Sequence, residues 1–172
     1  MPSWFLGKIR YQQTDDSLTD TRKDGSGELP RLKTINEAYL LDAVSYTDAE
    51  ARLYRLVADN TPEFSITAIR PMRLSDVFHF EGGEKWYKCK VIYMTEDERS
   101  GKEKKVINMM LVNAGTVKEA HARIEESLRT MLVPFEITDI NLTPILEVWP
   151  YEPEEEKIPA NLRPLSEVAV QA

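Results

Sequence analysis

One pattern of residues occurs twice in this chain, and that repetition limits the possible folds more than any other feature of the sequence. When position 51 is laid on position 122, a shift of 71 residues, Ala51-Arg52-Leu53 meets Ala122-Arg123-Ile124. The same shift lays Phe64-Ser65-Ile66-Thr67 on Phe135-Glu136-Ile137-Thr138, and the alignment runs without a gap from position 39 to position 78. A repeat of this length predicts a fold built from two copies of one supersecondary unit.

The first strand of each copy also matches, but with a longer shift. Trp4-Phe5 falls on Trp86-Tyr87, a shift of 82 residues, so the first copy contains eleven additional residues before position 39. These residues belong to segment 12–33, which is polar, contains glycine and has no apolar period. Because a longer surface loop adds little closure entropy, we expect this segment to be a loop in which the copies diverged.

The repeat sets the expected domain boundaries. Residues 1–151 are predicted to form a single duplicated domain, with repeat one at 4–80 and repeat two at 84–151. A unit of this size buries too little surface to be stable alone, so the two copies should share a core with pseudo-twofold symmetry. The acidic, proline-containing segment 152–172 is expected to be a tail.

Each copy has the residue pattern of a strand–strand–helix–strand unit. Aromatic and β-branched residues predict the strands, an apolar stripe predicts the helix, and a proline follows each helix. The spacings Thr47 to Glu50 and Thr116 to Glu119 fit a capping box, so the helices should begin at Ser45 or Thr47 and at Thr116. The expected strands are 4–11, 35–43 and 64–69, and then 86–93, 106–114 and 135–140.

Segments 74–80 and 145–149 should either continue the third strand of each copy or form a fourth strand. The elements together predict an α+β fold: an internal duplication of a ββαβ(β) unit with a largely antiparallel sheet. We expect the two helices to cover one face, and the sheets of the two copies to be joined or packed together.

The composition is that of a soluble globular protein, with 42% hydrophobic and 30% charged residues. No apolar stretch approaches the roughly 20 residues that a membrane-spanning helix needs. Cys89 is the single cysteine, so no intramolecular disulfide can form. These features predict a cytoplasmic protein with no membrane partner. The formal net charge of −7 argues against a protein that coats duplex DNA by bulk attraction.

Strand alternation supplies the candidate binding residues. If Phe5 and Tyr87 face the core, the opposite side of the first strand in each copy presents a tryptophan and two basic residues. Cations for phosphate and aromatic rings for stacking are what single-stranded nucleic acid requires. Alternating lysine is also typical of the solvent side of a half-buried strand, and that interpretation stays open. The candidate nucleic-acid-binding residues are Trp4, Lys8, Arg10, Trp86, Lys88 and Lys90.

Arg70 and Arg73 add basic charge beside the third strand of the first copy. Their counterparts in the second copy are Asn141 and Pro144, which carry no charge. The two copies are therefore not expected to form two equal sites.

No catalytic or metal-binding pattern is present in the sequence. His79 and His121 are the only histidines, and no zinc-ligand spacing, phosphate-binding glycine loop or nucleophile motif occurs. Asp15, Asp16 and Asp20 lack the glycine and the final glutamate of a calcium loop. We therefore expect no enzyme activity, no metal and no cofactor; catalysis by scattered carboxylates is the residual alternative.

Segments 85–91, 97–102 and 114–124 resemble a domain family of unknown function found in gut Bacteroidetes and their phages. The resemblance extends over most of residues 3–151. It implies a cytoplasmic bacterial or phage protein encoded near DNA-replication or recombination functions. It implies no catalytic or binding residues, so none is transferred to this sequence.

Two functional hypotheses follow. The first is a non-enzymatic accessory protein that binds single-stranded DNA or RNA through the candidate residues. The alternative is a protein–protein interaction or assembly module in which the tryptophan-bearing strand docks a partner or a second copy by edge-strand pairing.

Overall fold

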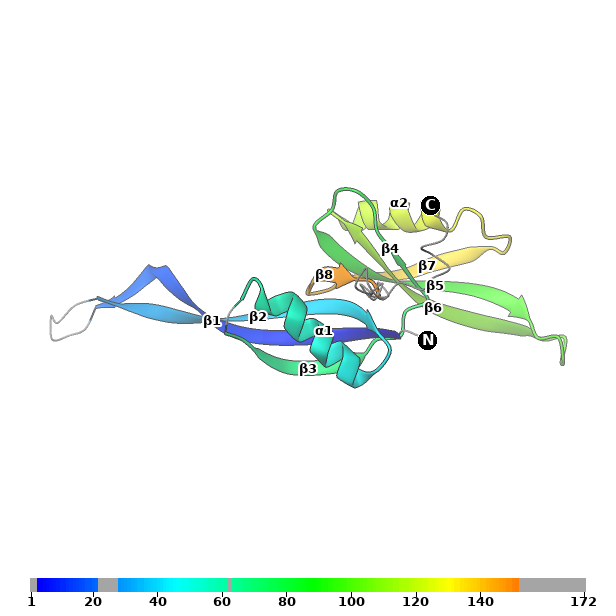
Figure 1. The fold of residues 1–172 in the computed structure, drawn as a ribbon. Helices are drawn as coiled ribbons and strands as arrows, with labels where there is room; N and C mark the ends of the chain where they lie inside the picture. Colours follow the sequence, from blue (N-terminus) through cyan, green and yellow to red (C-terminus); the bar gives the residue numbers. More distant parts are fainter. Residues whose placement is uncertain (1–2, 22–27, 62, 152–172) are drawn as a thin grey trace, which may run out of the picture.

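A computed structural model of the chain describes residues 3–21, 28–61 and 63–151 (Figure 1). Two helices and two mostly antiparallel four-stranded sheets make up the α+β fold that the sequence predicts. The first half contains β1 (Ser3–Thr21), β2 (Glu28–Ala43), α1 (Tyr46–Ala58), β3 (Ser65–Pro71) and β4 (Asp76–Phe78). The second half contains β5 (Lys85–Glu96), β6 (Glu103–Ala114), α2 (Val117–Ser127), β7 (Phe135–Leu142) and β8 (Ile145–Trp149).

The two halves exchange their last strands. The strand order is β3-β1-β2-β8 in the first sheet and β4-β6-β5-β7 in the second, so β4 and β8 each lie in the sheet of the other half. Both exchanged strands pair in parallel, with Val77 opposite Leu111 and Val148 opposite Leu40. These two pairs are related by the 71-residue shift of the sequence repeat. The expected fourth strands therefore exist, and the origin of the halves by duplication stays a prediction.

Equivalent caps begin the two helices. The Ser45 hydroxyl accepts a hydrogen bond from the backbone N–H of Asp48 (3.1 Å), and the Thr116 hydroxyl accepts one from Glu119 (3.2 Å). The Asp48 carboxylate in turn accepts from the backbone N–H of Val44 at 3.0 Å. These bonds satisfy N–H groups that have no partner inside a helix. The predicted start at Thr116 is confirmed, and Ser45 rather than Thr47 caps the first helix.

Each helix covers its own sheet, so the expectation that both helices cover one face is wrong. Leu53 and Val57 of α1 pack on Phe5 and Ile9 of the first sheet. Ala120 and Ile124 of α2 pack in the same way on the second sheet. Because two separate sheets form, each needs an apolar helix stripe on one of its faces. Figure 1 shows α1 and α2 on different sheets.

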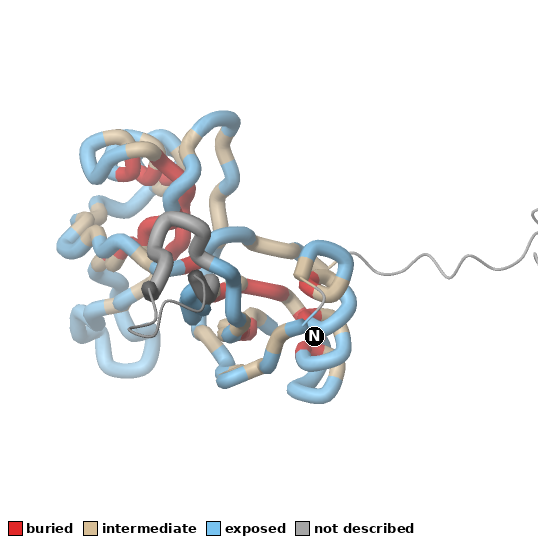
Figure 2. Tube along the Cα trace, turned by 90° about the vertical axis from the view of Figure 1, so that its left-hand side faces the viewer, coloured by how far each residue is buried: buried red, intermediate tan, exposed pale blue. Residues whose placement is uncertain are grey.

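A third core joins the faces that carry no helix. Its buried residues come from both halves, and most of its members are pairs related by the sequence repeat. Figure 2 shows buried stretches inside both halves, with exposed backbone around them. The members of this shared core are Leu40, Trp86, Leu111 and Ile145, with Trp4, Leu6, Met72, Leu74, Val77 and Val148 packed against them.

Segment 12–33 is largely a β-hairpin and not the expected loop. Antiparallel pairing of β1 with β2 continues through Asp15 opposite Arg31 and, beyond a register shift, to Thr21 opposite Glu28. The hairpin extends well beyond α1 and β3 (Figure 1). Residues 12–14 and 31–34 are exposed. Because no core covers these residues, backbone pairing maintains the strands without an alternating apolar pattern.

Several expectations fall on residues outside the described structure. These are the tail at 152–172, Pro62 after α1, and the side chains of Asp15, Asp16 and Asp20. Among the described residues, no helix combines the length and the apolar character required to cross a membrane.

Candidate nucleic-acid interface

Trp86 lies in the shared core, and its expected exposure is wrong. The residue is 5% exposed and packs with Leu40, Leu111 and Ile145. The prediction assumed that this face of β5 is open to solvent in each copy. In the structure the other sheet covers the face and removes the indole from solvent. Trp4, the equivalent residue, is half-buried and stays partly accessible.

The predicted basic residues differ between the two sheets. Lys8 is half-buried and Arg10 is exposed, with the Arg10 Nε donating to the Asn36 side-chain oxygen at 3.2 Å. Lys88 and Lys90 are both half-buried. The Lys90 Nζ lies 3.9 Å from an Asp139 carboxylate oxygen, so part of its charge is compensated.

The first sheet has a face with cations and no neighbouring carboxylate, which we call the basic face: Lys8, Arg10 and Arg70. Residues directly opposite one another on paired strands share a face. Lys8 pairs with Ala68 and Ala38, Arg10 with Ser65 and Asn36, and Arg70 with Leu6. Among the described residues, none of these three cations forms an ion pair. The basic face therefore keeps its positive charge.

The corresponding face of the second sheet is not basic. Lys90 is opposite Asp139 and Ile92 is opposite Glu136. These two acids are the repeat equivalents of Ala68 and Ser65 in the first sheet. Asp139 thus compensates part of the charge of Lys90, and Glu136 adds a second carboxylate to this face. Of the predicted basic residues, only Lys8 and Arg10 lie on the basic face, where Arg70 joins them.

Neither tryptophan lies on an edge strand. In the first sheet β1 lies between β3 and β2, and in the second β5 lies between β6 and β7. Backbone groups near Trp4 and Trp86 already bond to neighbouring segments: the Trp4 carbonyl accepts from Met72 N–H at 2.8 Å and the Trp86 carbonyl from Thr143 N–H at 2.9 Å. The expected docking route by edge-strand pairing at these tryptophans is therefore wrong.

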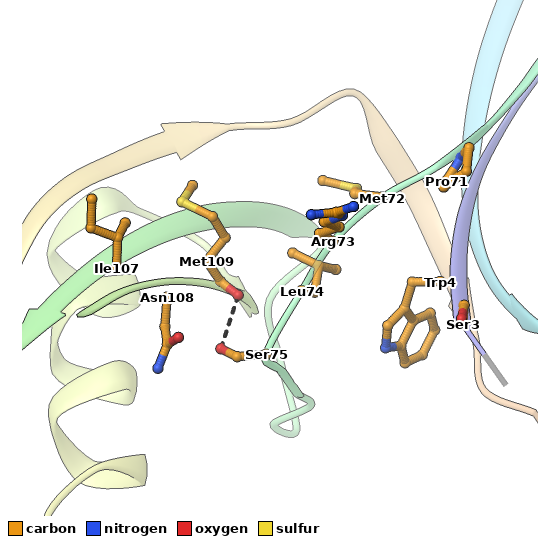
Figure 3. Close-up of a pocket in the computed structure, with 10 residues that line it drawn as sticks. All are labelled: Ser3, Trp4, Pro71, Met72, Arg73, Leu74, Ser75, Ile107, Asn108 and Met109. Carbon is orange, nitrogen blue, oxygen red and sulfur yellow. Dashed lines mark hydrogen bonds between the residues drawn. The ribbon is translucent and has the colours of Figure 1, made fainter. Parts of the chain in front are cut away.

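Trp4 lines a pocket of about 600 Å³ where the first sheet meets β6 (Figure 3). Figure 3 shows Trp4 on one side and Ile107 and Met109 on the other, with the β3–β4 connector between them. The connector is fixed to β6 because the Ser75 N–H and hydroxyl both donate to the Met109 carbonyl, at 2.8 and 3.1 Å. The lining residues are Ser3, Trp4, Pro71, Met72, Arg73, Leu74, Ser75, Ile107, Asn108 and Met109.

Sequence reasoning identified Trp4 and Arg73 of this pocket but missed Asn108 and Met109. These residues lie on a strand of the other half and approach Trp4 only because the chain crosses between sheets after β3. The one signal of this pocket in the sequence was that Arg73 is charged whereas its repeat equivalent, Pro144, is not.

A separate polar cluster surrounds Glu37 on β2. The hydroxyl of Tyr11 donates to one Glu37 carboxylate oxygen at 2.6 Å, and that of Tyr39 donates to the other. The Tyr39 ring stacks on Trp149 with 4.6 Å between centroids. The hydrogen bond to Glu37 raises the pKa of Tyr11, and burial followed by that hydrogen bond raises the pKa of Tyr39. Both tyrosines therefore stay protonated and donate hydrogen bonds to Glu37, which stabilises this part of the first sheet.

Cys89 lies inside the core of the second sheet. It is fully buried, and desolvation raises the pKa of its thiol to about 11. A thiol with that pKa is protonated at neutral pH and is a poor nucleophile. Within the described part of the chain, no three histidine, cysteine, aspartate or glutamate side chains gather where they could hold a metal ion.

Comparison with known proteins gives a family and no assigned function. No curated protein and no solved structure matches the chain. One family model does match, over residues 3–151, and therefore covers both halves and both sheets. The chain belongs to the family described as domain of unknown function DUF4494.

Proposed function

We propose that this protein binds single-stranded nucleic acid through the basic face of its first sheet and catalyses no reaction. The observation that carries the proposal is the charge of that face. Lys8, Arg10 and Arg70 lie on neighbouring strands with no carboxylate directly opposite any of them. A groove or face of cations that follows the backbone, combined with an aromatic side chain, is the usual arrangement for binding single strands.

A single strand fits this surface better than a duplex does. The whole chain carries a net charge of −7, which repels a large polyanion wherever the acidic parts approach it. A short single strand can instead follow a local basic face, because salt screens charges beyond about 10 Å at 0.1 M ionic strength. Lys8 and Arg10 are two residues apart on β1, so their side chains emerge about 7 Å apart along the strand.

The residues that we propose to bind nucleic acid include only some of the six predicted from the sequence. Trp4, Lys8 and Arg10 contribute directly, together with Arg70 and Arg73. Trp86 is buried, and the face that carries Lys88 and Lys90 also carries the carboxylates of Asp139 and Glu136. The biological setting implied by the sequence resemblance is DNA replication or recombination in a phage or mobile element, where such a protein would act as an accessory factor in the cytoplasm.

Fluorescence anisotropy with a labelled oligo(dT) tests the proposal. We expect binding at low salt that weakens steeply as salt rises. The double variant Lys8→Ala/Arg10→Ala should bind at least 10-fold more weakly, with a log–log salt slope shallower by about 1.4, because about 0.7 is lost per phosphate contact on a single strand. The matched control is Lys104→Ala/Lys105→Ala, which removes two exposed charges from β6 and should leave affinity nearly unchanged.

Two results would count against the proposal. One is an absence of oligonucleotide binding by the folded wild-type protein at low salt. The other is an equal loss of affinity in the Lys8/Arg10 and Lys104/Lys105 variants, which would indicate non-specific charge. Salt-insensitive self-association without oligonucleotide binding would support the assembly alternative instead.

A further inference from the structure

We infer that the pocket beside Trp4 receives one unstacked base of the bound strand, while Arg73 contacts the adjoining phosphate. The inference rests on the proposed function and adds a defined site to it. The pocket volume of about 600 Å³ falls within the range of about 300–1,000 Å³ typical of small-molecule sites and is large enough for a base with its sugar.

The chemistry of the lining suits a base. Trp4 presents an aromatic face, and Met72 and Met109 present polarizable sulfur groups that pack favourably on flat rings. Stacking of a base on an aromatic side chain is tolerant of sequence because every base has a π-face. Figure 3 shows Trp4 on one side of the connector and Met109 on the other, so Trp4 supplies the aromatic stacking surface.

The polar groups of the lining suit the edge of a base and a phosphate. The Asn108 amide has both donor and acceptor atoms, and it forms no side-chain hydrogen bond with the described residues. Arg73 is exposed and is the one charged residue among those that line the pocket. Because the lining contains no carboxylate, nothing in it repels an anion.

The pocket continues the basic face. Trp4 lies on the same side of β1 as Lys8 and Arg10, at the start of the strand. The Trp4 carbonyl accepts a hydrogen bond from Met72 N–H at 2.8 Å, which fixes the segment carrying Arg73 next to Trp4. Leu6, between Lys8 and Trp4 on this side of β1, packs in the shared core. A strand that crosses Arg10 and Lys8 would therefore reach Arg73 and the pocket past the exposed Arg70, which lies opposite Leu6 on β3.

The second half has no equivalent pocket lining. The positions that correspond to Asn108 and Met109 are Glu37 and Ala38, and the position that corresponds to Arg73 is Pro144. Ala38 and Ile145 are 3% and 4% exposed, so the equivalent place is filled by apolar side chains. Arg73, Trp4 and the basic face thus belong to the first half, and β6 of the second half completes the pocket lining.

Two pocket variants test the inference with the labelled oligo(dT) used above. Trp4→Leu should weaken binding by about 5- to 100-fold, the range expected when stacking of one base is lost. Asn108→Ala should weaken it by about 2- to 10-fold, the range expected for one hydrogen bond. Their salt slopes should equal that of the wild type, because the phosphate contacts are retained. Asn141→Ala, an exposed asparagine opposite Lys88 on β7, is the matched control and should bind like the wild type.

An oligomer of the same length made only of abasic sites separates base from backbone. Wild type and Asn108→Ala should bind this oligomer equally, since it has no base for the pocket. Melting curves check whether Trp4→Leu is folded. If Trp4→Leu does not fold, Asn108→Ala alone tests the pocket. If both pocket variants bind oligo(dT) like the wild type while Lys8→Ala/Arg10→Ala does not, the pocket inference falls and the proposed function stands. If the wild type binds no oligonucleotide, both fall.

Discussion

Asp42 and Asn113 occupy equivalent positions on β2 and β6, yet Asp42 keeps a buried side-chain oxygen without a hydrogen-bond partner among the described residues and Asn113 does not. The Asn113 amide donates to the Phe80 carbonyl and accepts from the Phe80 N–H, both at 2.7 Å. Asp42 accepts from the N–H of Tyr151, the repeat equivalent of Phe80, and one buried carboxylate oxygen, Oδ1, has no partner among the described residues. Each pair holds the segment that follows an exchanged strand, and desolvation raises the pKa of Asp42.

Asp42→Asn should stabilise the protein by about 1–2 kcal/mol at pH 7, because an amide can donate where the carboxylate cannot. The pKa of Asp42 is higher in the folded than in the unfolded state, so the wild type gains stability on protonation and loses it as pH rises through the folded pKa. The advantage of the variant should therefore be large at pH 7 and small at pH 3. Denaturant unfolding at the two pH values measures it, and an equal gain at both would contradict the account.

Asn113→Asp should have the opposite effect and a larger one. Asn113 is 2% exposed, and its amide nitrogen faces the carbonyl oxygens of Phe80, Gly82 and Gly83. A carboxylate there would oppose three acceptors without a donor, at a cost of about 3 kcal/mol or more. Thermal unfolding at pH 7 should show a large loss of Tm, with Asn108→Ala as a control of similar position on β6. A change within error of the control would be inconsistent with this role.

Arg123→Ala should cost more stability than Arg52→Ala, although the two arginines are repeat equivalents. Arg123 donates to the carbonyls of Gly82 and Asn113 at 2.6 Å each, pairs with Glu119 and lies over the Phe80 ring. Arg52 donates to the Pro150 carbonyl at 3.2 Å and lies over the Tyr151 ring. We expect about 2–3 kcal/mol for Arg123 and about 1 kcal/mol for Arg52, measured by urea unfolding; the reverse order would be contrary to the structure.

Gly83→Ala should be much more destabilising than Gly82→Ala. Both glycines have positive φ, 111° and 75°, but a Cβ on Gly83 would lie 2.8 Å from the Ala114 Cα, whereas Gly82 has open space around it. We expect about 1 kcal/mol for Gly82 from backbone strain alone and about 3 kcal/mol for Gly83, where overpacking is added. Equal melting temperatures for the two variants would rule out the close contact.

The tyrosine cluster predicts a loss of stability in alkaline solution. Tyr39 has a raised pKa because it is buried and donates to Glu37, so its contribution is present below pH 10 and is lost as pH rises above that value. Tyr39→Phe cannot ionise and should lose less stability than the wild type between pH 9 and pH 11. Unfolding experiments across that range check the prediction; parallel curves for the two proteins would refute it.

Much of the local structure could be predicted because it depends on neighbouring residues. Alternation along β1 and β5 placed Phe5 and Tyr87 on the core side, and both are buried. The cap at Thr116 follows from the same local logic. What sequence could not supply is the partner of each strand: Val77 pairs with Leu111 of the other half, and no periodicity records that choice. The burial of Trp86 follows from this exchange, so its expected exposure was wrong for a non-local reason.

The residues of the candidate site also include some that the sequence could predict and others that only the tertiary structure reveals. Lys8, Arg10 and the asymmetry of Arg70 and Arg73 are visible in the sequence because they need only alternation and alignment of the copies. Ala68 is uncharged, but that it lies opposite Lys8 and leaves the lysine without a carboxylate neighbour there is known only from the register of β1 with β3. Asn108 enters the pocket from a strand of the other half, which spacing along the chain does not indicate.

The exchange of β4 and β8 also has a consequence for synthesis. A ribosome makes β1 and β2 early, but β8, the strand that completes their sheet, is the last described strand to emerge. Similarly, β4 has no partner until β6 has been translated. The edge of β2 that pairs with β8 therefore stays unpaired while the second half is synthesised. Neither four-stranded sheet can therefore be completed until strands of the second half have been translated.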